Sequence, residues 1–358
     1  MRKDMTISPE VARAKEALDN VIRKSRVHLY KPIQVAEILY YDRTEKNINL
    51  LNLEEYRNKS KKWRDEICLP LLGRVCTSSA KFQDNLFENN ALPPTMLAIL
   101  GKENRRTGGA VEAYIYKRFL TKHLQLSKAL DYCLNATAEI FDVKRFLSLF
   151  WLEPGLKRSI DKIYEIIVYA LFSSLVEALD LQVKISVDAS KFPLLQEFES
   201  FSRKVMSLDI SNPSYIQNAK VYRVGVTNAA DRGLDMYSNW GPAIQIKHLS
   251  LDVDLAQNIV ESISSDRIVI VCKSAEKSVI LSLLTQIGWR ARIQSIITED
   301  DLTEWYEKAL RGTYSKLLSK TLISTLIDEI SNEFPSVKII PPQIKKRNYE
   351  KIHNYYWN

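Results

Sequence analysis

Apolar residues in the first 150 positions recur at intervals of three and four, the spacing that places them along one face of a helix. Val11, Leu18 and Ile22 show this spacing directly after Ser8 and Pro9, a favourable cap and first-turn residue. The pattern predicts a helical region from residue 8 to about 150. Its predicted helices include 53–67, one capped by Ser78 or Ser79, 110–133 and 137–151, with a polar loop at 102–109.

Apolar and polar residues alternate after position 180, which is typical of a strand with one polar face. Leu181, Val183 and Ile185 alternate there with Gln182 and Lys184. Strands mixed with helices predict an α/β (α+β) fold, in which helices flank a central mixed β-sheet. Strands are predicted at 181–187, 221–226, 243–249, 267–272 and 290–297, and helices at 157–179, 191–207, 255–264, 276–286, 301–310 and 313–332.

The change of pattern near Pro154 and Gly155 predicts a domain boundary. Residues 1–153 would form a helical N-terminal region, and residues 154–340 the domain built around the sheet. Residues 341–358 mix basic and aromatic side chains, and we expect this C-terminal tail to be partly disordered.

The charge balance favours basic residues, with 51 Lys and Arg against 43 Asp and Glu, a net charge of +8 and a pI near 9.1. This surplus is compatible with a polyanionic partner such as nucleic acid. The chain contains no P-loop and no GxGxxG motif. ATP-driven and dinucleotide-dependent reactions therefore have no support in the sequence.

The four cysteines form no CxxC pair, and no histidine lies at zinc-ligand spacing. This excludes a recognisable zinc site and favours reduced thiols in a cytoplasmic protein. The first residues lack the apolar core of a signal peptide. The most apolar run, 163–179, contains Glu165 and Glu177, so we expect a buried helix there and no membrane span.

Asp235 and the Gln245-x-Lys247 pattern are candidates for phosphodiester chemistry. Residues 239–242, Asn-Trp-Gly-Pro, predict a tight turn, so that Asp235 and Gln245 would lie on neighbouring antiparallel strands. Gln245 and Lys247 are two positions apart and would project from the same face of their strand, while the intervening isoleucine points into the core.

Hydrolysis of a phosphodiester requires an activated water and a countercharge for the phosphate, and Mg²⁺ bound to oxygen ligands provides both. Asp235 would bind the metal through its carboxylate, and Gln245 through its amide oxygen. Lys247 would hold or polarise the attacking water and offset the charge of the phosphate. Gly233 would leave room for the phosphate backbone.

A neutral glutamine in this position requires another acid for metal binding. Glu165 is the preferred candidate, because its helix precedes the first strand and should pack across the sheet near the polar end. Glu177 is the second choice, and Asp231 could contribute from the loop before Asp235.

The same residues would also fit a solvated β-hairpin with one polar face. Gln182-Val183-Lys184 shows the same alternation, but a helix precedes it, so that no acid would lie opposite. The helix and apolar strand that follow 235–247 in the expected order favour the catalytic interpretation. His248 would point to the other face of its strand, as a core or interface residue.

Basic residues in two parts of the N-terminal region, with one more beside Asp235, are candidates for phosphate contacts. A solvated helix face with ion pairs four residues apart explains the first group equally well, and surface loops often carry the second. The candidate DNA-binding residues are Lys61, Lys62, Arg64, Arg105, Arg106 and Arg232.

The segments 231–235 and 240–249 resemble the PD-(D/E)XK nucleases, in the variant where glutamine replaces the second acid. More narrowly, the chain resembles the HaeII-type restriction endonucleases over nearly its whole length, including residues 25–32, 53–57 and 264–271. The resemblance implies a restriction-endonuclease-like core and a type II enzyme that cuts double-stranded DNA with Mg²⁺ at the palindrome RGCGCY. Asp235, Gln245 and Lys247 match the catalytic motif of the family, and Glu165 is carried over less securely because the helical acid has no tight signature.

We therefore expect the helical N-terminal region to help grip DNA, and a cell that makes such an enzyme would need a cognate methyltransferase to protect its own DNA. A palindromic target is matched most simply by a two-fold homodimer. Two alternatives remain: a structure-specific repair or junction-resolving nuclease of the same fold, and a non-catalytic DNA-binding protein.

Overall fold

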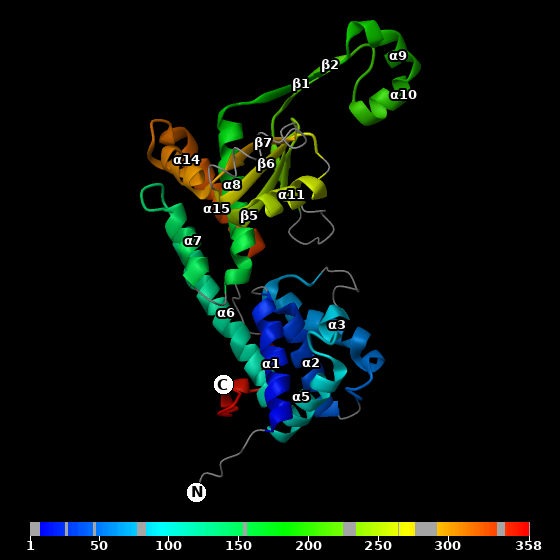
Figure 1. Cartoon of the computed structure of the whole chain (residues 1–358), viewed down its shortest axis with the longest axis vertical. Coiled ribbons are helices and arrows are strands. Elements are labelled where there is room, and N and C mark those ends of the chain that lie inside the picture. Colours follow the sequence, from blue (N-terminus) through cyan, green and yellow to red (C-terminus); the bar gives the residue numbers. More distant parts are fainter. Residues whose placement is uncertain are drawn as a thin grey trace.

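The computed structural model describes residues 8–25, 28–45, 48–76, 84–152, 156–224, 234–263, 265–275, 292–334 and 341–357. Figure 1 shows an elongated molecule with a helical N-terminal lobe at one end and a lobe built on a β-sheet, here called the sheet lobe, at the other. Helix α6 (Ala110–Leu134) belongs to both lobes. Ile115 and Phe119 in its first half pack in the N-terminal core, whereas Leu126 and Leu130 in its second half pack in the core under the sheet.

The helices of the N-terminal lobe begin and end at residues suited to those positions. The Ser8 hydroxyl accepts a hydrogen bond from the Val11 amide, as its sequence position predicts, and Gly73 ends α3 with a φ of 70°. The predicted caps Ser78 and Ser79 lie outside the described residues. The lobe contains α1 (Pro9–Lys24), α2 (Tyr30–Glu45), α3 (Leu53–Leu72), η1 (Asn85–Phe87), α5 (Pro94–Arg106) and the first half of α6.

The prediction of a polar loop at 102–109 is wrong over most of that range, because α5 continues to Arg106. Polar side chains in this segment form hydrogen bonds with other helices. The buried Asn104 amide donates to the Leu39 carbonyl, and its oxygen accepts from the amides of Val111 and Glu112. A polar helix end is therefore stable here, since its buried groups have partners.

The C-terminal tail is ordered from residue 341 to 357, contrary to the expectation of partial disorder. It forms α16 (Pro342–Lys346) and η5 (Tyr349–Lys351) and docks on the N-terminal lobe, where Trp357 is buried in the core. Arg347 donates to both carboxylate oxygens of Glu37 at 2.7 and 2.8 Å and lies over the Tyr40 ring. The tail thus completes the first lobe rather than extending the second.

A five-stranded mixed sheet forms the centre of the sheet lobe, which confirms the predicted fold class. The order β3-β4-β5-β6-β7 follows the sequence, with antiparallel pairs up to β5 and parallel pairs after it. The strands are β3 (Val221–Arg223), β4 (Met236–Ser238), β5 (Ala243–Leu251), β6 (Ile268–Ala275) and β7 (Ile293–Ile297).

Helices cover both faces of this sheet. Ile244 and Ile246 of β5 pack on one face with residues of several helices, whereas Ile268 and Ile270 of β6 pack on the other with α11 (Val253–Ser262). The helix predicted at 276–286 lies outside the described residues. The helices on the first face are α7 (Val143–Leu152), α8 (Ile160–Ala178), which follows η2 (Lys157–Ser159), α14 (Glu299–Arg311) and α15 (Ser315–Glu333).

The strand predicted at 181–187 exists as β1 (Gln182–Ser186), but it does not join the central sheet. It pairs with β2 (Ser214–Asn218), a strand that the sequence pattern did not predict. The two form a ribbon that projects from the body and carries a helical tip (Figure 1). The tip contains η3 (Ala189–Lys191), α9 (Phe192–Glu197), α10 (Glu199–Phe201) and the π-helical turn η4 (Ser202–Met206), in place of one predicted helix at 191–207.

The predicted boundary residues Pro154 and Gly155 lie outside the described residues. In terms of packing, the two cores meet within α6, well before that position. None of the helices in the described ranges has the length and apolar character needed to cross a membrane.

Candidate functional site

Asp235 and Gln245 face each other across two antiparallel strands, as the sequence predicts. Asp235 directly precedes β4, and the register pairs Met236 with Ile244, which places Asp235 opposite Gln245. The strands are joined by a turn in which the Ser238 amide donates to the Pro242 carbonyl at 3.0 Å. Gly241 within this turn has a φ of 123°, a conformation that favours glycine.

Hydrogen bonds hold the Asp235 carboxylate against β5. Its Oδ2 atom accepts from Gln245 Nε2 at 2.5 Å and from the Ile246 backbone amide at 2.7 Å. Gln245 is only 2% exposed, and its Oε1 atom is buried without a hydrogen-bond donor among the described residues. Lys247 lies farther along β5. Burial raises the pKa of Asp235, and the hydrogen bond from the Ile246 amide and the positive charge of Lys247 oppose that increase. The three motif residues therefore lie together at one end of the β4–β5 pair.

Glu165 reaches the same region from α8, which packs against β3 and β5. Its side chain is 7% exposed, and Lys162 Nζ binds its two carboxylate oxygens at 2.8 and 2.7 Å. Burial raises the pKa of Glu165 to about 7, and the nearby charge of Asp235 contributes to the increase. Burial also raises the pKa of Asp235. The two carboxylates thus share one poorly solvated environment.

The alternative acids are not placed in this environment. Glu177 is exposed on the last turn of α8, about 18 Å along the helix from Glu165 at 1.5 Å per residue. Asp231 lies outside the described residues, as does Gly233. Among the described acids considered, the structure brings Glu165 to the motif.

Two cationic residues that the sequence analysis missed contact the Glu165 environment. Lys162 lies one helical turn before Glu165, so helical periodicity could have identified it. Arg223 on β3 lies 4.0 Å from the Glu165 carboxylate and also pairs with Glu329 at 2.7 Å and Glu333 at 3.4 Å. The contacts of Arg223 join β3 to α8 and α15, which are far apart in the sequence, so no local pattern predicts them.

The sequence analysis expected His248 to be a core or interface residue. The structure places it outside the core, partly buried between β5 and α8. Its Nδ1 atom contacts the Asp161 carboxylate on α8, and its ring lies 5.6 Å from the Trp151 ring. Asp161 in turn raises the pKa of Asp235 through its charge. His248 and Asp161 therefore lie beside the motif.

The donor set fits a hard divalent cation. Asp235, Glu165 and Gln245 offer carboxylate and amide oxygens, the ligands that Mg²⁺ and Ca²⁺ prefer. The unpartnered Gln245 Oε1 atom supports this, because a buried amide oxygen without a donor is costly unless something else binds it. Within the described ranges no cluster of three His, Cys, Asp or Glu is suited to a metal, so such a site would depend on the glutamine.

The three candidate DNA-binding residues on α3 differ in how exposed their side chains are. The prediction that Arg64 belongs to an exposed basic patch is wrong: its side chain is 2% exposed and binds Asp65 and Gln34. Lys61 is half-buried, with its amino group 3.3 Å from an aspartate next to η1. Lys62 is exposed.

The second group lies on α5 and not in a loop. Arg105 pairs with the buried Asp42, and Arg106 pairs with Glu103 at 2.7 Å while remaining half exposed. Arg232 lies outside the described residues. Any role of these residues in phosphate binding stays a prediction.

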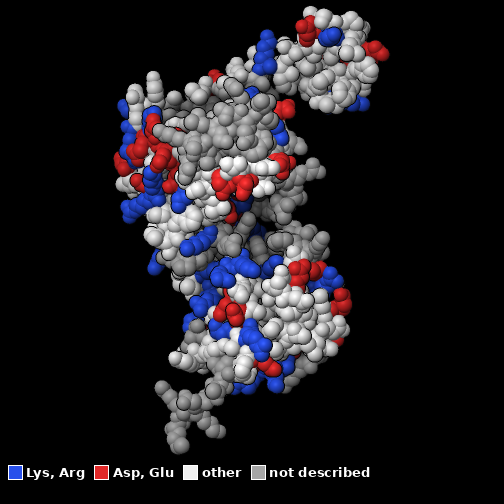
Figure 2. All heavy atoms as spheres, in the orientation of Figure 1, with Lys and Arg blue, Asp and Glu red and all other residues white. Residues whose placement is uncertain are grey.

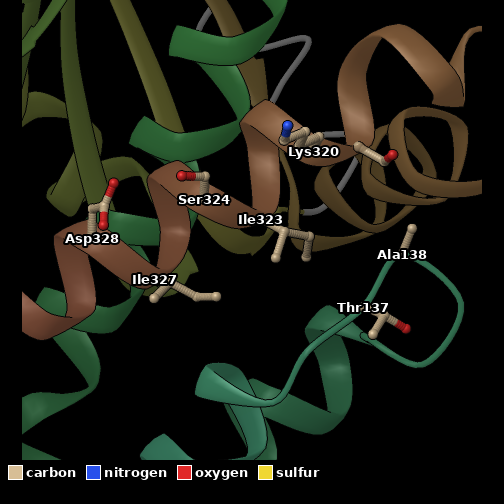
Figure 3. Close-up of a pocket in the computed structure, with 8 residues that line it drawn as sticks. Thr137, Ala138, Lys320, Ile323, Ser324, Ile327 and Asp328 are labelled. Atoms are coloured by element: carbon tan, nitrogen blue, oxygen red, sulfur yellow. The ribbon is translucent and has the colours of Figure 1, made fainter.

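A surface hollow of about 380 Å³ lies between α15 and the segment that follows α6 (Figure 3). None of the candidate catalytic residues lines it. Its lining residues are Thr137, Ala138, Ser319, Lys320, Ile323, Ser324, Ile327 and Asp328.

Comparison with known proteins identifies the family. The family model described as HaeII restriction endonuclease matches residues 14–349. The chain belongs to this family. It is 62% identical to the type II restriction enzyme HaeII of Haemophilus aegyptius over 327 aligned residues. The aligned region covers 91% of this chain and 93% of that enzyme. It is 60% identical over 328 residues to the type II restriction enzyme NgoBI of Neisseria gonorrhoeae, with 92% and 93% covered.

No solved structure matches the chain. The family resemblance stated from the sequence is confirmed, and with it the assignment as a type II restriction endonuclease. Membership of the family also confirms that the chain is an enzyme.

Proposed function

We propose that the chain hydrolyses phosphodiester bonds of double-stranded DNA in a Mg²⁺-dependent reaction of the PD-(D/E)XK type. Asp235, Gln245, Lys247 and Glu165 would form the active site. The observation that carries the proposal is the pairing of Asp235 with Gln245 across β4 and β5, with the Gln245 amide oxygen buried and unpartnered.

The roles of the residues follow from their contacts. Asp235 Oδ2 is held by two N–H donors, so the other carboxylate oxygen is the one offered to the cation. Gln245 would add its Oε1 atom, and Glu165 would add an oxygen once Lys162 releases it. A bound Mg²⁺ lowers the pKa of a coordinated water and neutralises charge on the phosphate.

Lys247 would act on the water and the phosphate and not on the cation. Its position two residues after Gln245 keeps it next to the ligands on the same strand. The ammonium group would orient the attacking water and offset the charge that develops on the phosphate oxygens. Lys162 would be free to pair with the DNA backbone after it leaves Glu165.

Both lobes would contact the DNA. Figure 2 shows Lys and Arg side chains gathered on the part of the N-terminal lobe nearest the sheet lobe, a distribution suited to phosphate contacts. The palindrome RGCGCY, implied by the family resemblance, contains guanines that Arg or Lys read in the major groove. A homodimer, a cytoplasmic location and a partner methyltransferase complete the proposal.

Incubation of the purified protein with plasmid DNA and Mg²⁺, followed by sequencing of the fragment ends, tests this function. Discrete fragments that all end within RGCGCY, and that disappear when EDTA is added, are expected. Nicks that follow DNA junctions or distortions, regardless of sequence, would instead identify a structure-specific nuclease.

A further inference from the structure

A contact between the two lobes lies at the end of α15, where it meets Arg74 of the N-terminal lobe. Arg74 follows Gly73, the residue that ends α3, and its Nη2 atom donates to the backbone carbonyl of Glu333, the last residue of α15. The same nitrogen lies 2.6 Å from His28 Nε2, and the His28 ring stacks on the Tyr30 ring with centroids 5.6 Å apart. Arg74 therefore contacts its own lobe and the sheet lobe at once.

The end of α15 needs a donor from outside the helix. The last carbonyl groups of a helix have no partner within it and carry a partial negative charge, which a cation stabilises. The last turn of α15 contains no basic residue of its own, and Glu333 is buried, which keeps water from supplying the donor. The Arg74 guanidinium supplies it and so fixes the end of α15 relative to the N-terminal lobe.

The side chain of Glu333 connects this contact to the candidate active site. Its carboxylate lies 3.4 Å from Arg223 Nη1, and the Glu329 carboxylate one turn earlier lies 2.7 Å from Arg223 Nη2. The Arg223 Nη1 atom also lies 4.0 Å from the Glu165 carboxylate. The Arg223 side chain is 7% exposed, and separating a buried guanidinium from its carboxylates is costly. The position of α15 thus sets the position of Arg223 beside the helical acid.

Arg223 differs from Lys162, the other cation at Glu165, in the residues that hold it. Lys162 lies on the same helix as Glu165, and in the proposed function it leaves the carboxylate when the divalent cation binds. Arg223 is also bound to two carboxylates of α15, so it would stay in place. It would then be the cation that orients Glu165 toward the metal.

We propose that Arg74 is a positioning residue for Glu165, because it fixes the end of α15 and thereby the Arg223 guanidinium that contacts the Glu165 carboxylate. The inference rests on the proposed role of Glu165 as a metal ligand. It gives the N-terminal lobe a part in the cation site without providing a ligand from that lobe. Correct placement of the two lobes is then a condition for cleavage.

Substitution of Arg74 tests this connection. Arg74→Met removes the guanidinium and should lower the single-turnover cleavage rate and the Ca²⁺ affinity about tenfold each, as for the loss of an outer residue that orients a ligand. DNA affinity without divalent cations should stay within about twofold of the wild type, because no binding contact is removed. Arg74→Lys, which still offers a donor to the carbonyl, should restore most of both quantities. Arg13→Met is the matched control and should behave as the wild type, since Arg13 also donates to a backbone carbonyl, that of Pro9 at 3.5 Å, but within its own helix.

A second variant tests whether Arg74 acts through Glu333. Glu333→Gln weakens the ion pair with Arg223 and leaves the backbone carbonyl in place. Because both changes affect one connection, the variant that carries both should cleave within about twofold of the slower single variant. A double variant whose loss is the product of the two single losses would overturn the proposal, as would wild-type cleavage and Ca²⁺ affinity in Arg74→Met.

The same assays separate the proposal from its alternatives. Weaker DNA binding by Arg74→Met with unchanged Ca²⁺ affinity would identify Arg74 as a DNA contact and overturn its positioning role. Full activity of Glu165→Gln would refute the proposed function. An inactive Glu165→Gln together with a wild-type Arg74→Met would overturn this inference alone and leave the proposed function standing.

Discussion

Protonation of Glu165 should control how tightly the protein binds a divalent cation. Burial raises the pKa of this carboxyl group to about 7 in the metal-free protein, above its ordinary value of 4.5. Only the ionised form is a cation ligand, so a proton must leave Glu165 before it can bind. Affinity is therefore expected to be high above pH 7 and to decline as the pH falls through 7.

The size of the effect follows from the ionised fraction of Glu165. With a pKa of about 7, roughly nine-tenths of the carboxyl groups are ionised at pH 8 and about one-tenth at pH 6. The dissociation constant should therefore increase about tenfold between pH 8 and pH 6, and binding at pH 6 should release close to one proton per cation.

Isothermal titration calorimetry with Ca²⁺, a hard cation that prefers the same oxygen ligands, measures both quantities. Titrations in two buffers of different ionisation enthalpy give the number of protons released. Glu165→Gln should bind more weakly at pH 8 and lose most of the pH dependence. Glu177→Gln, on the exposed end of the same helix, is the control and should behave as the wild type.

A pH dependence that is the same in Glu165→Gln and in the wild type would exclude Glu165 as the group whose ionisation controls cation binding. Weaker binding in the Glu177→Gln control would also contradict this assignment, because that side chain lies about 18 Å from Glu165 along α8.

Three further changes test other parts of the structure. Gln245→Glu should lower the melting temperature of the metal-free protein, because it places a second buried carboxylate beside that of Asp235. Ca²⁺ should raise the melting temperature of this variant more than that of the wild type. The same increase in both proteins would speak against a metal ligand at this position. Arg64→Met should lower the free energy of unfolding in urea by about 2 kcal/mol, because the buried amide oxygen of Gln34 loses the Arg64 donor, while DNA affinity stays the same. Weaker DNA binding would instead support Arg64 as a DNA contact. Arg347→Ala should cost about 3 kcal/mol by leaving the buried Glu37 without its cation, and an unaltered unfolding midpoint would show that the tail is not required for stability.

The part of the site that the sequence predicted is the part that depends on local geometry. A turn at 239–242 and a two-residue strand period are enough to place Asp235 opposite Gln245 and to keep Lys247 beside it. The buried isoleucines on either side of Gln245 likewise follow from alternation. These features needed no knowledge of the distant parts of the chain.

The features that the sequence did not reveal depend on tertiary contacts. Arg223 neutralises acids from α8 and α15, and Asn104 satisfies buried groups of α2 and α6, so neither role follows from neighbours in the sequence. The strand at 181–187 was predicted, but its partner β2 was not, because alternation identifies a strand and not the sheet that it joins. The tail was assigned by composition, which does not show that Arg347 has a buried partner.

Single-turnover cleavage of DNA by Lys247→Ala tests the central claim most directly. The rate should fall at least about 100-fold, as expected when a group that acts on the attacking water is lost, while DNA binding in Ca²⁺ is retained. Lys184→Ala, in the similar Gln-x-Lys pattern on β1, should cleave as the wild type. Full activity of Lys247→Ala would contradict the assignment of the active site to β4 and β5.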